Sequence, residues 1–174
     1  VANAMAQGRI YIDGDIGARG MTMTKHNPRF EAPELWVFGK AGDSFAEFMA
    51  GGIAVVCGVG AENEQDVLGY RPCVGMVGGK IFFRGRQSSY SSSDARCVTD
   101  LPDQEWSWLK KNLKIFLQAI GKQYLCEELT AKRSDWQLLI ALKPHEKKGR
   151  TLRPMNVFHQ EAWDKELGRG GLIG

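Results

Sequence analysis

Three ten-residue segments that align with one another without gaps decide the fold. They read MAQGRIYIDG from Met5 to Gly14, MAGGIAVVCG from Met49 to Gly58 and MVGGKIFFRG from Met76 to Gly85. Each begins with Met, has Gly three residues later and ends with Gly after an apolar run. A weaker copy, PELWVFG from Pro33 to Gly39, keeps the apolar run and the closing Gly. Short β-rich runs that recur in this way predict parallel strands stacked as a solenoid.

Glycine supplies 21 of the 174 residues, and the repeat gives this excess a structural role. A chain that turns sharply at the end of a strand often needs a positive φ angle, which glycine adopts without steric cost. We therefore expect glycines at the corners of the stacked units. The predicted structural corner glycines are Gly8, Gly14, Gly39, Gly52, Gly58, Gly79 and Gly85.

Alignment of the four runs predicts which side chains share a face of the sheet. Two columns are wholly apolar and are expected to point into the solenoid; they are Ile10, Leu35, Ala54, Ile81 and Ile12, Val37, Val56, Phe83. The opposite parity carries a third apolar column between charged ones, here named the outer stripe: Tyr11, Trp36, Val55 and Phe82. An apolar column with a charged rim is typical of a covered surface. Either the second half of this chain covers it or the stripe faces a partner subunit.

The second half of the chain has a different pattern. QSSYSSSD, residues 87–94, is small and polar and indicates a linker over 87–102. Helical spacing of Trp106, Leu109 and Leu113 predicts a helix with Asp103 as its N-cap and Gly121 as its end, and a second helical stretch follows at 123–132. The apolar run in SDWQLLIALKP, 134–144, is compatible with a last helical turn or a short extended segment.

The predicted organisation is therefore a β domain at 1–86, a linker at 87–102, a helical extension at 103–144 packed on the β domain, and a basic arm and tail at 145–174. Phe158, Trp163 and Leu167 in the tail lack a strong period, which favours docking on a partner.

Composition excludes several classes of protein. Hydrophobic residues make up 43% of the chain, which argues against disorder. A net charge of +3 is too small to indicate nucleic-acid binding. Glycine or a charged residue interrupts every apolar run, and no signal peptide is recognised, so a cytoplasmic protein without membrane contact is expected. The four cysteines form no CxxC pair, which favours buried thiols over metal ligands.

No catalytic, cofactor-binding or metal-binding residue is predicted. His26, His145 and His159 fall in expected loops or the tail, without the motif of a nucleophilic triad. The cluster Glu62, Glu64 and Asp66 is best interpreted as a solvated face. The loop GDIGARG, residues 14–20, with Arg19 and Lys25 nearby, is a weak candidate for anion binding, because the repeat already accounts for its glycines.

The repeat also resembles a known family. GDIGARGMTMTKHNP at 14–28, GKAGDSFAEFMAGGIAVVCG at 39–58 and CVGMVGGKIFFRG at 73–85 resemble the GXGXG domain at the C-terminal end of the glutamate synthase large chain, and are similar to a subunit of formylmethanofuran dehydrogenase. The resemblance implies a mainly β fold, a single-stranded right-handed parallel β-helix with a small α-helical C-terminal extension. Ala46 and Phe48 depart from the family, which often has Gly there.

The same resemblance implies a function. The chain would be a non-catalytic structural or assembly subunit, or an excised domain, of a glutamate-synthase-like oxidoreductase complex in glutamate biosynthesis and nitrogen metabolism. Amidotransferase and FMN-domain proteins would be its partners, and FMN and the iron–sulfur cluster would lie in those partners; a homo-oligomer is also possible. The alternative is a scaffold subunit of another redox complex, such as a formylmethanofuran-dehydrogenase-like assembly. An independent hydrolase is disfavoured because no nucleophile lies within a recognisable catalytic motif.

Overall fold

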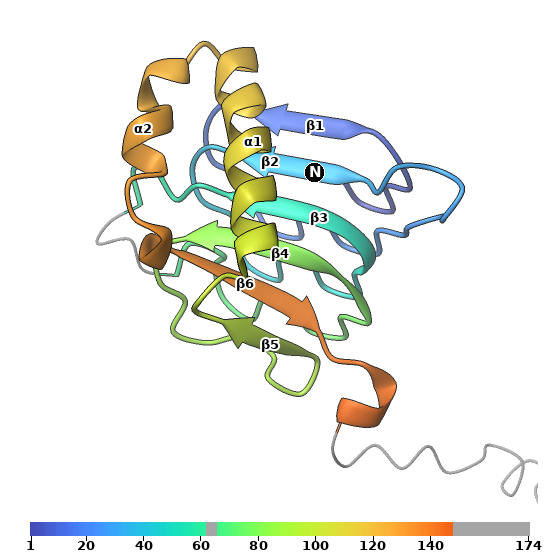
Figure 1. Ribbon diagram of the computed structural model, residues 1–174. Coiled ribbons are helices and arrows are strands. Elements are labelled where there is room, and N and C mark those ends of the chain that lie inside the picture. Colours follow the sequence, from blue (N-terminus) through green and yellow to red (C-terminus); the bar gives the residue numbers. More distant parts are fainter. Residues whose placement is uncertain (62–65, 148–174) are drawn as a thin grey trace, which may run out of the picture.

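The computed structural model describes residues 1–61 and 66–147. Figure 1 shows one sheet crossed by a helix. The strands are β1 (Arg9–Ile12), β2 (Glu34–Val37), β3 (Ala50–Val56), β4 (Gly78–Arg84), β5 (Ala95–Val98) and β6 (Trp136–Ala141). The helices are α1 (Asp103–Ala119) and α2 (Cys126–Leu129), with short 3-10 turns η2 (Gln123–Leu125), η3 (Arg133–Asp135) and η4 (Pro144–Glu146).

The predicted fold class is wrong. The structure is a mixed α/β fold whose six-stranded sheet has the order β1-β2-β3-β4-β6-β5. The first four strands are parallel, but β6 runs antiparallel to β4 and β5 runs antiparallel to β6. A single-stranded parallel β-helix has no place for such strands. The difference arises because the free edge of β4 accepts a strand from the C-terminal half, and edge pairing is a tertiary event that the local pattern does not encode.

The predicted alignment of the four parallel runs is confirmed. Ile10 pairs with Leu35, Leu35 with Ala54 and Ala54 with Ile81, so the first interior column is in register across β1 to β4. The outer stripe is aligned in the same way. A shift of one residue would move each column to the opposite face, so the alternation of apolar and charged residues determines this register.

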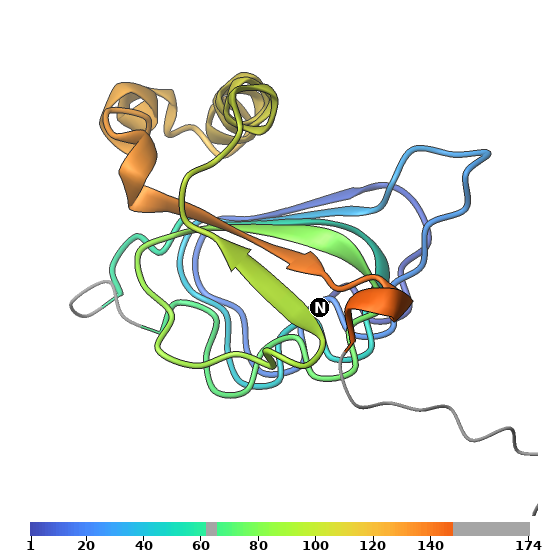
Figure 2. The same ribbon diagram turned by 60° about the horizontal axis from the view of Figure 1, so that its bottom comes forward.

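Two hydrophobic cores lie on the two faces of the sheet. The first packs the interior columns against the loops between the strands, and includes buried Met21, Met49 and Met76. The second packs the outer stripe against α1, through Leu109, Leu113 and Phe116 among others. Figure 2 shows the resulting three layers, with the helices on one side of the sheet and the loops on the other.

The corner glycines are placed as the repeat predicts, with one correction to their reason. Six of them have a positive φ, namely Gly8, Gly14, Gly52, Gly58, Gly79 and Gly85. Gly39 is outside that region. A Cβ atom there would overlap the Asp15 carboxylate and lie 2.9 Å from the carbonyl carbon of Gly14. Gly39 is therefore needed for close packing of neighbouring loops.

The second half also requires corrections. Helix α1 forms where its spacing predicts, and Gly121 beyond it has φ +71°. Its N-cap position, however, is occupied by Pro102, with no side-chain cap, and Asp103 is the first helical residue. The predicted linker contains β5, and the apolar run within 134–144 is extended, as β6. Of the predicted arm and tail, 148–174 lie outside the described residues.

Candidate functional site

The outer stripe is covered by the chain's own helix. Trp108 of α1 stacks on Trp36, with ring centroids 5.8 Å apart, and on Phe82, at 5.4 Å. Phe116, two turns further along α1, contacts Tyr11 with a centroid distance of 5.3 Å. Of the two covers considered from the sequence, the structure selects the helical extension. The possible partner-facing role of this stripe is thereby excluded for Trp36, Val55 and Phe82, which are buried.

A buried carboxylate is hydrogen-bonded to one residue of the outer stripe. Glu34 accepts a hydrogen bond of 2.8 Å from the indole N–H of Trp36, and its carboxylate lies 3.2 Å from the guanidinium of Arg9. The charge of Glu34 is the main reason that the pKa of Arg9 is raised. The Glu34 carboxylate connects Arg9 of β1 to Trp36 of β2, so its role is structural.

Several groups of the loop considered for anion binding are engaged within the protein. The amides of Ile16 and Arg19 donate to the carbonyls of Lys40 and Asp43, at 2.9 and 2.8 Å. The Arg19 side chain lies 3.8 Å from the carboxylate of Glu47. A phosphate would have to displace these partners, so the geometry gives the anion hypothesis no support.

The two buried thiols, Cys57 and Cys73, are unreactive. Burial raises the pKa of Cys57 and of Cys73 to about 12 each, so neither forms a thiolate at neutral pH. No disulfide links the four cysteines, and no group of three potential metal ligands occurs among residues 1–61 and 66–147.

The histidines are not brought together. Exposed His26 contacts the carbonyl of Phe30 at 3.1 Å, and His145 lies in η4. His159 is outside the described ranges, as are Glu62 and Glu64 of the acidic cluster.

A buried ion pair holds the end of the described chain. The Asp94 carboxylate accepts hydrogen bonds from the Gly75 amide at 2.9 Å and the Ser91 hydroxyl at 2.7 Å, and lies 3.1 Å from the ammonium group of Lys147. Burial by itself would raise the pKa of Asp94, but these donors hold it below its ordinary value. The pair ties the segment after β6 to the loop layer.

The loop layer has an unusual backbone. Among the described residues, eleven that are not glycine have a positive φ. They alternate along the chain at Arg19, Met21 and Met23, and again at Ser44, Ala46 and Phe48. A non-glycine residue in this region costs about 1–2 kcal/mol. Hydrogen bonds between neighbouring loops, such as Met23 N–H to the Glu47 carbonyl at 3.0 Å, keep the loops in this conformation.

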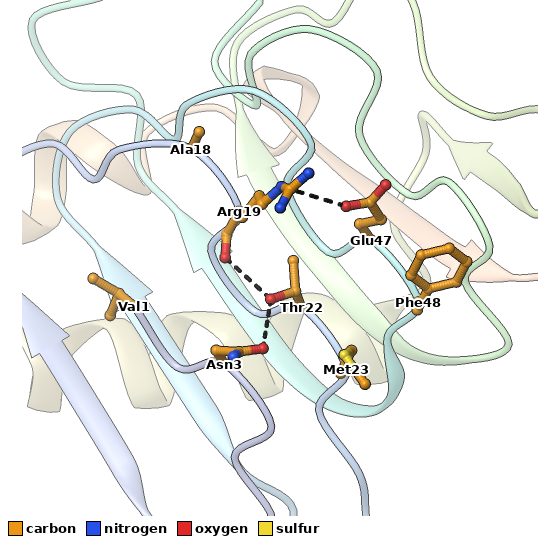
Figure 3. Close-up of a pocket in the computed structure, with 8 residues that line it drawn as sticks. All are labelled: Val1, Asn3, Ala18, Arg19, Thr22, Met23, Glu47 and Phe48. Atoms are coloured by element: carbon orange, nitrogen blue, oxygen red, sulfur yellow. Dashed lines mark hydrogen bonds and ion pairs between the residues drawn. The ribbon is translucent and has the colours of Figure 1, made fainter.

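These loops form a surface hollow of about 540 Å³, which we name the loop hollow. Figure 3 shows its lining side chains, including Asn3, Arg19, Thr22, Glu47 and Phe48. The Thr22 hydroxyl donates to the Asn3 side chain at 2.8 Å, and Arg19 pairs with Glu47.

Two large apolar side chains that line the loop hollow are exposed to solvent. Met23 is 54% exposed and Phe48 is 56% exposed, although both occupy left-handed positions at which glycine is less strained. Each residue therefore costs backbone energy without filling the core. The hollow lacks a paired nucleophile and base among its described residues, and its chemistry suits contact with an apolar group of another molecule. Sequence reasoning missed this hollow; its only sign was Phe48, at a position where the resembling family often has glycine.

Comparisons with known proteins add no identity to these observations. No protein-family model matches the chain, and a search of curated proteins finds no match either. Within the described ranges, no helix combines the length and the apolar character that crossing a bilayer requires.

Proposed function

We propose that the chain is a non-catalytic structural or assembly subunit, or a domain with that role, of a glutamate-synthase-like oxidoreductase complex in the cytoplasm. The observation that carries the proposal is the in-register stacking of the repeated units from β1 to β4. This stack is the part of the chain that resembles the glutamate synthase GXGXG domain. In that family the chemistry belongs to the amidotransferase and FMN-containing parts, which the β domain holds together.

The distribution of polar groups supports a scaffold role. The buried charges of Glu34 and Asp94 are both engaged in hydrogen bonds and ion pairs that connect segments of the fold. The groups with a large upward shift in pKa are the buried thiols of Cys57 and Cys73. A rigid body with contact surfaces is the function that these groups serve best.

Reconstitution tests the proposal. The chain is co-expressed with an amidotransferase protein and an FMN-domain protein of the glutamate synthase type. Glutamate formed from glutamine and 2-oxoglutarate, with a reduced electron donor supplied, is measured with and without each component. We expect a complex of all the components whose activity needs this chain, and no turnover by the chain alone. Activity of the purified chain would contradict the proposal, as would a fully active complex that neither binds nor needs it.

The loop hollow offers a surface variant for the same assay. Phe48→Ser with Met23→Ser removes the exposed apolar groups, and Tyr70→Ser, which also removes an exposed ring, is the matched control. If partners contact the hollow, the double variant weakens assembly while the control does not. A complex with one-carbon redox proteins in place of the amidotransferase would instead indicate the formylmethanofuran-dehydrogenase-like alternative.

A further inference from the structure

The core is open at the edge formed by β1. In the described sheet β1 pairs only with β2, as Figure 1 shows, whereas β6 and then β5 cover the corresponding edge of β4. Along the two interior columns, burial decreases from β2 to β1. Leu35 and Val37 of β2 are completely buried, but their neighbours Ile10 and Ile12 in β1 are only partly buried. An uncovered edge with apolar residues is a site at which another strand can pair.

The backbone groups that face this edge are identified by the bonds on the other side. Glu34 N–H donates to the Gly8 carbonyl at 2.9 Å, and Phe38 N–H donates to the Ile12 carbonyl at 3.0 Å. Even-numbered residues of β1 therefore direct their polar groups toward β2. Because these directions alternate along a strand, Arg9 and Tyr11 direct theirs toward the open edge.

The sequence of this edge is complementary to itself. When two copies of Arg9-Ile10-Tyr11-Ile12-Asp13 lie antiparallel about a two-fold axis at Tyr11, Arg9 is opposite Asp13 and Ile10 is opposite Ile12. Opposite charges and apolar residues in directly facing positions stabilise a strand pair. Arg9 and Tyr11 have the parity whose backbone groups face the open edge, and Asp13, which directly follows β1, shares that parity.

In the register centred on Tyr11, side chains on both faces of the sheet take part in the strand pair. Tyr11 and Asp13 lie on the helix side of the sheet, where Tyr11 contacts Phe116 and Asp13 pairs with Lys122. Ile10 and Ile12 lie on the loop side, against the first core. A register centred on Ile10 would place Arg9 opposite Tyr11, and one centred on Ile12 would place Asp13 opposite Tyr11, so the register centred on Tyr11 is the one in which Arg9 and Asp13 face each other.

We infer that the β1 edge is a self-association surface, at which β1 of a second copy pairs antiparallel in the register centred on Tyr11. The two sheets then form one continuous sheet with a two-fold axis, which is the commonest symmetry of homodimers. The strand is four residues long. An interface of this size belongs with the small, transient class of protein contacts, so we expect dimers only at high protein concentration. The inference does not depend on the proposed oxidoreductase complex.

Charge-reversal variants test both the association and its register. Sedimentation velocity is measured on the purified 174-residue chain at rising concentration, then on Arg9→Glu and on Asp13→Lys. We expect the unmodified chain to dimerise, and each variant alone to remain monomeric because like charges face each other. An equimolar mixture of the two variants should dimerise again, because the introduced glutamate of one then faces the introduced lysine of the other. Arg96→Glu, an exposed reversal in β5 at the opposite end of the sheet, should dimerise like the unmodified chain.

A second measurement covers the case in which a reversal disturbs folding, since Arg9 and Asp13 also have partners within the chain. Amide hydrogen exchange of the unmodified chain is followed at low and high concentration. The Tyr11 amide should become protected as concentration rises. A chain that stays monomeric at about 1 mM, a concentration at which an association of about −4 kcal/mol would be well populated, overturns the inference. Dimers that form without protection of Tyr11, or a mixture that does not dimerise while both variants are folded, also overturn it.

Discussion

The ammonium group of Lys147 lies 3.1 Å from the carboxylate of Asp94, and the two side chains are only 11% and 4% exposed. Lys147 also donates a hydrogen bond of 2.9 Å to the carbonyl of Met76. These contacts join a residue that follows η4 to the loop layer beneath β4 and β5. The position of residues 142–147, between β6 and the end of the described range, thus depends on a charge pair that the surrounding residues shield from water.

Removal of the negative charge should loosen this junction. Asp94→Asn keeps an oxygen for the Gly75 amide but leaves the Lys147 ammonium without a buried counter-charge, so we expect a loss of about 2–4 kcal/mol in unfolding free energy. Urea denaturation measures the loss. Combining Asp94→Asn with Lys147→Met should cost less than the sum of the single changes, because the second change removes the unpaired charge. Strict additivity would contradict the coupling.

The Asp94 carboxylate should also affect how the unfolding free energy changes with pH in the acid range. Its pKa is lower in the folded chain than in the unfolded one, where it is about 4. Asp94 therefore contributes stability above pH about 4, and that contribution is lost as the pH falls through the folded-state pKa. The difference in unfolding free energy between the unmodified chain and Asp94→Asn should be largest near neutral pH and smaller at pH about 2. A constant difference would contradict this linkage.

The aromatic stack should be a major source of stability. Trp108 is partly buried and stacks on both Trp36 and Phe82, so Trp108→Ala removes two ring contacts and part of the cover of the second core. We expect a loss of about 2 kcal/mol in thermal or chemical unfolding, from the two ring contacts and the apolar area they cover. Lys111→Ala, an exposed position on the same helix, should change stability by less than about 0.5 kcal/mol. Similar losses for both variants would contradict the packing described.

The left-handed loops should tolerate glycine where an ordinary loop does not. Met23 has φ +56° and is 54% exposed, whereas Val77 is 60% exposed and lies outside that region. Met23→Gly relieves backbone strain, and Val77→Gly only adds freedom to the unfolded chain. We expect Met23→Gly to be the more stable of the two by about 1 kcal/mol in melting experiments. The reverse order would contradict the assigned strain.

Gly58 and Gly60 allow the cost of a positive φ to be measured apart from the cost of a steric overlap. Gly58 has φ +65° and a Cβ there would lie 2.6 Å from the Arg84 carbonyl oxygen, while Gly60 has φ +82° and open space. Gly60→Ala should therefore cost about 1 kcal/mol, and Gly58→Ala at least about 2 kcal/mol. The comparison of melting temperatures checks this, and equal effects would argue against the contact between the corner and β4.

The sequence by itself determined the strands of the repeat and their register. Alternating apolar residues and recurrent glycines are local signals, and a slip of one residue would expose the column of Ile10 and Leu35, so one alignment is strongly preferred. Helix α1 was predictable for the same reason, since its apolar spacing matches one helical face. The strand β6 was not, because the short run Trp136–Ala141 satisfies both periodicities.

Only the tertiary structure decided which surfaces are covered and which are free. Whether Trp36 meets Trp108 or a partner depends on the docking of α1 over the sheet, and no local pattern contains that contact. The antiparallel edge strands β6 and β5 replaced the expected continuous solenoid because β4 had an open edge within reach of the C-terminal half. The exposure of Phe48 and the uncovered edge of β1 are properties of the assembled layers, since burial depends on residues that are distant in sequence.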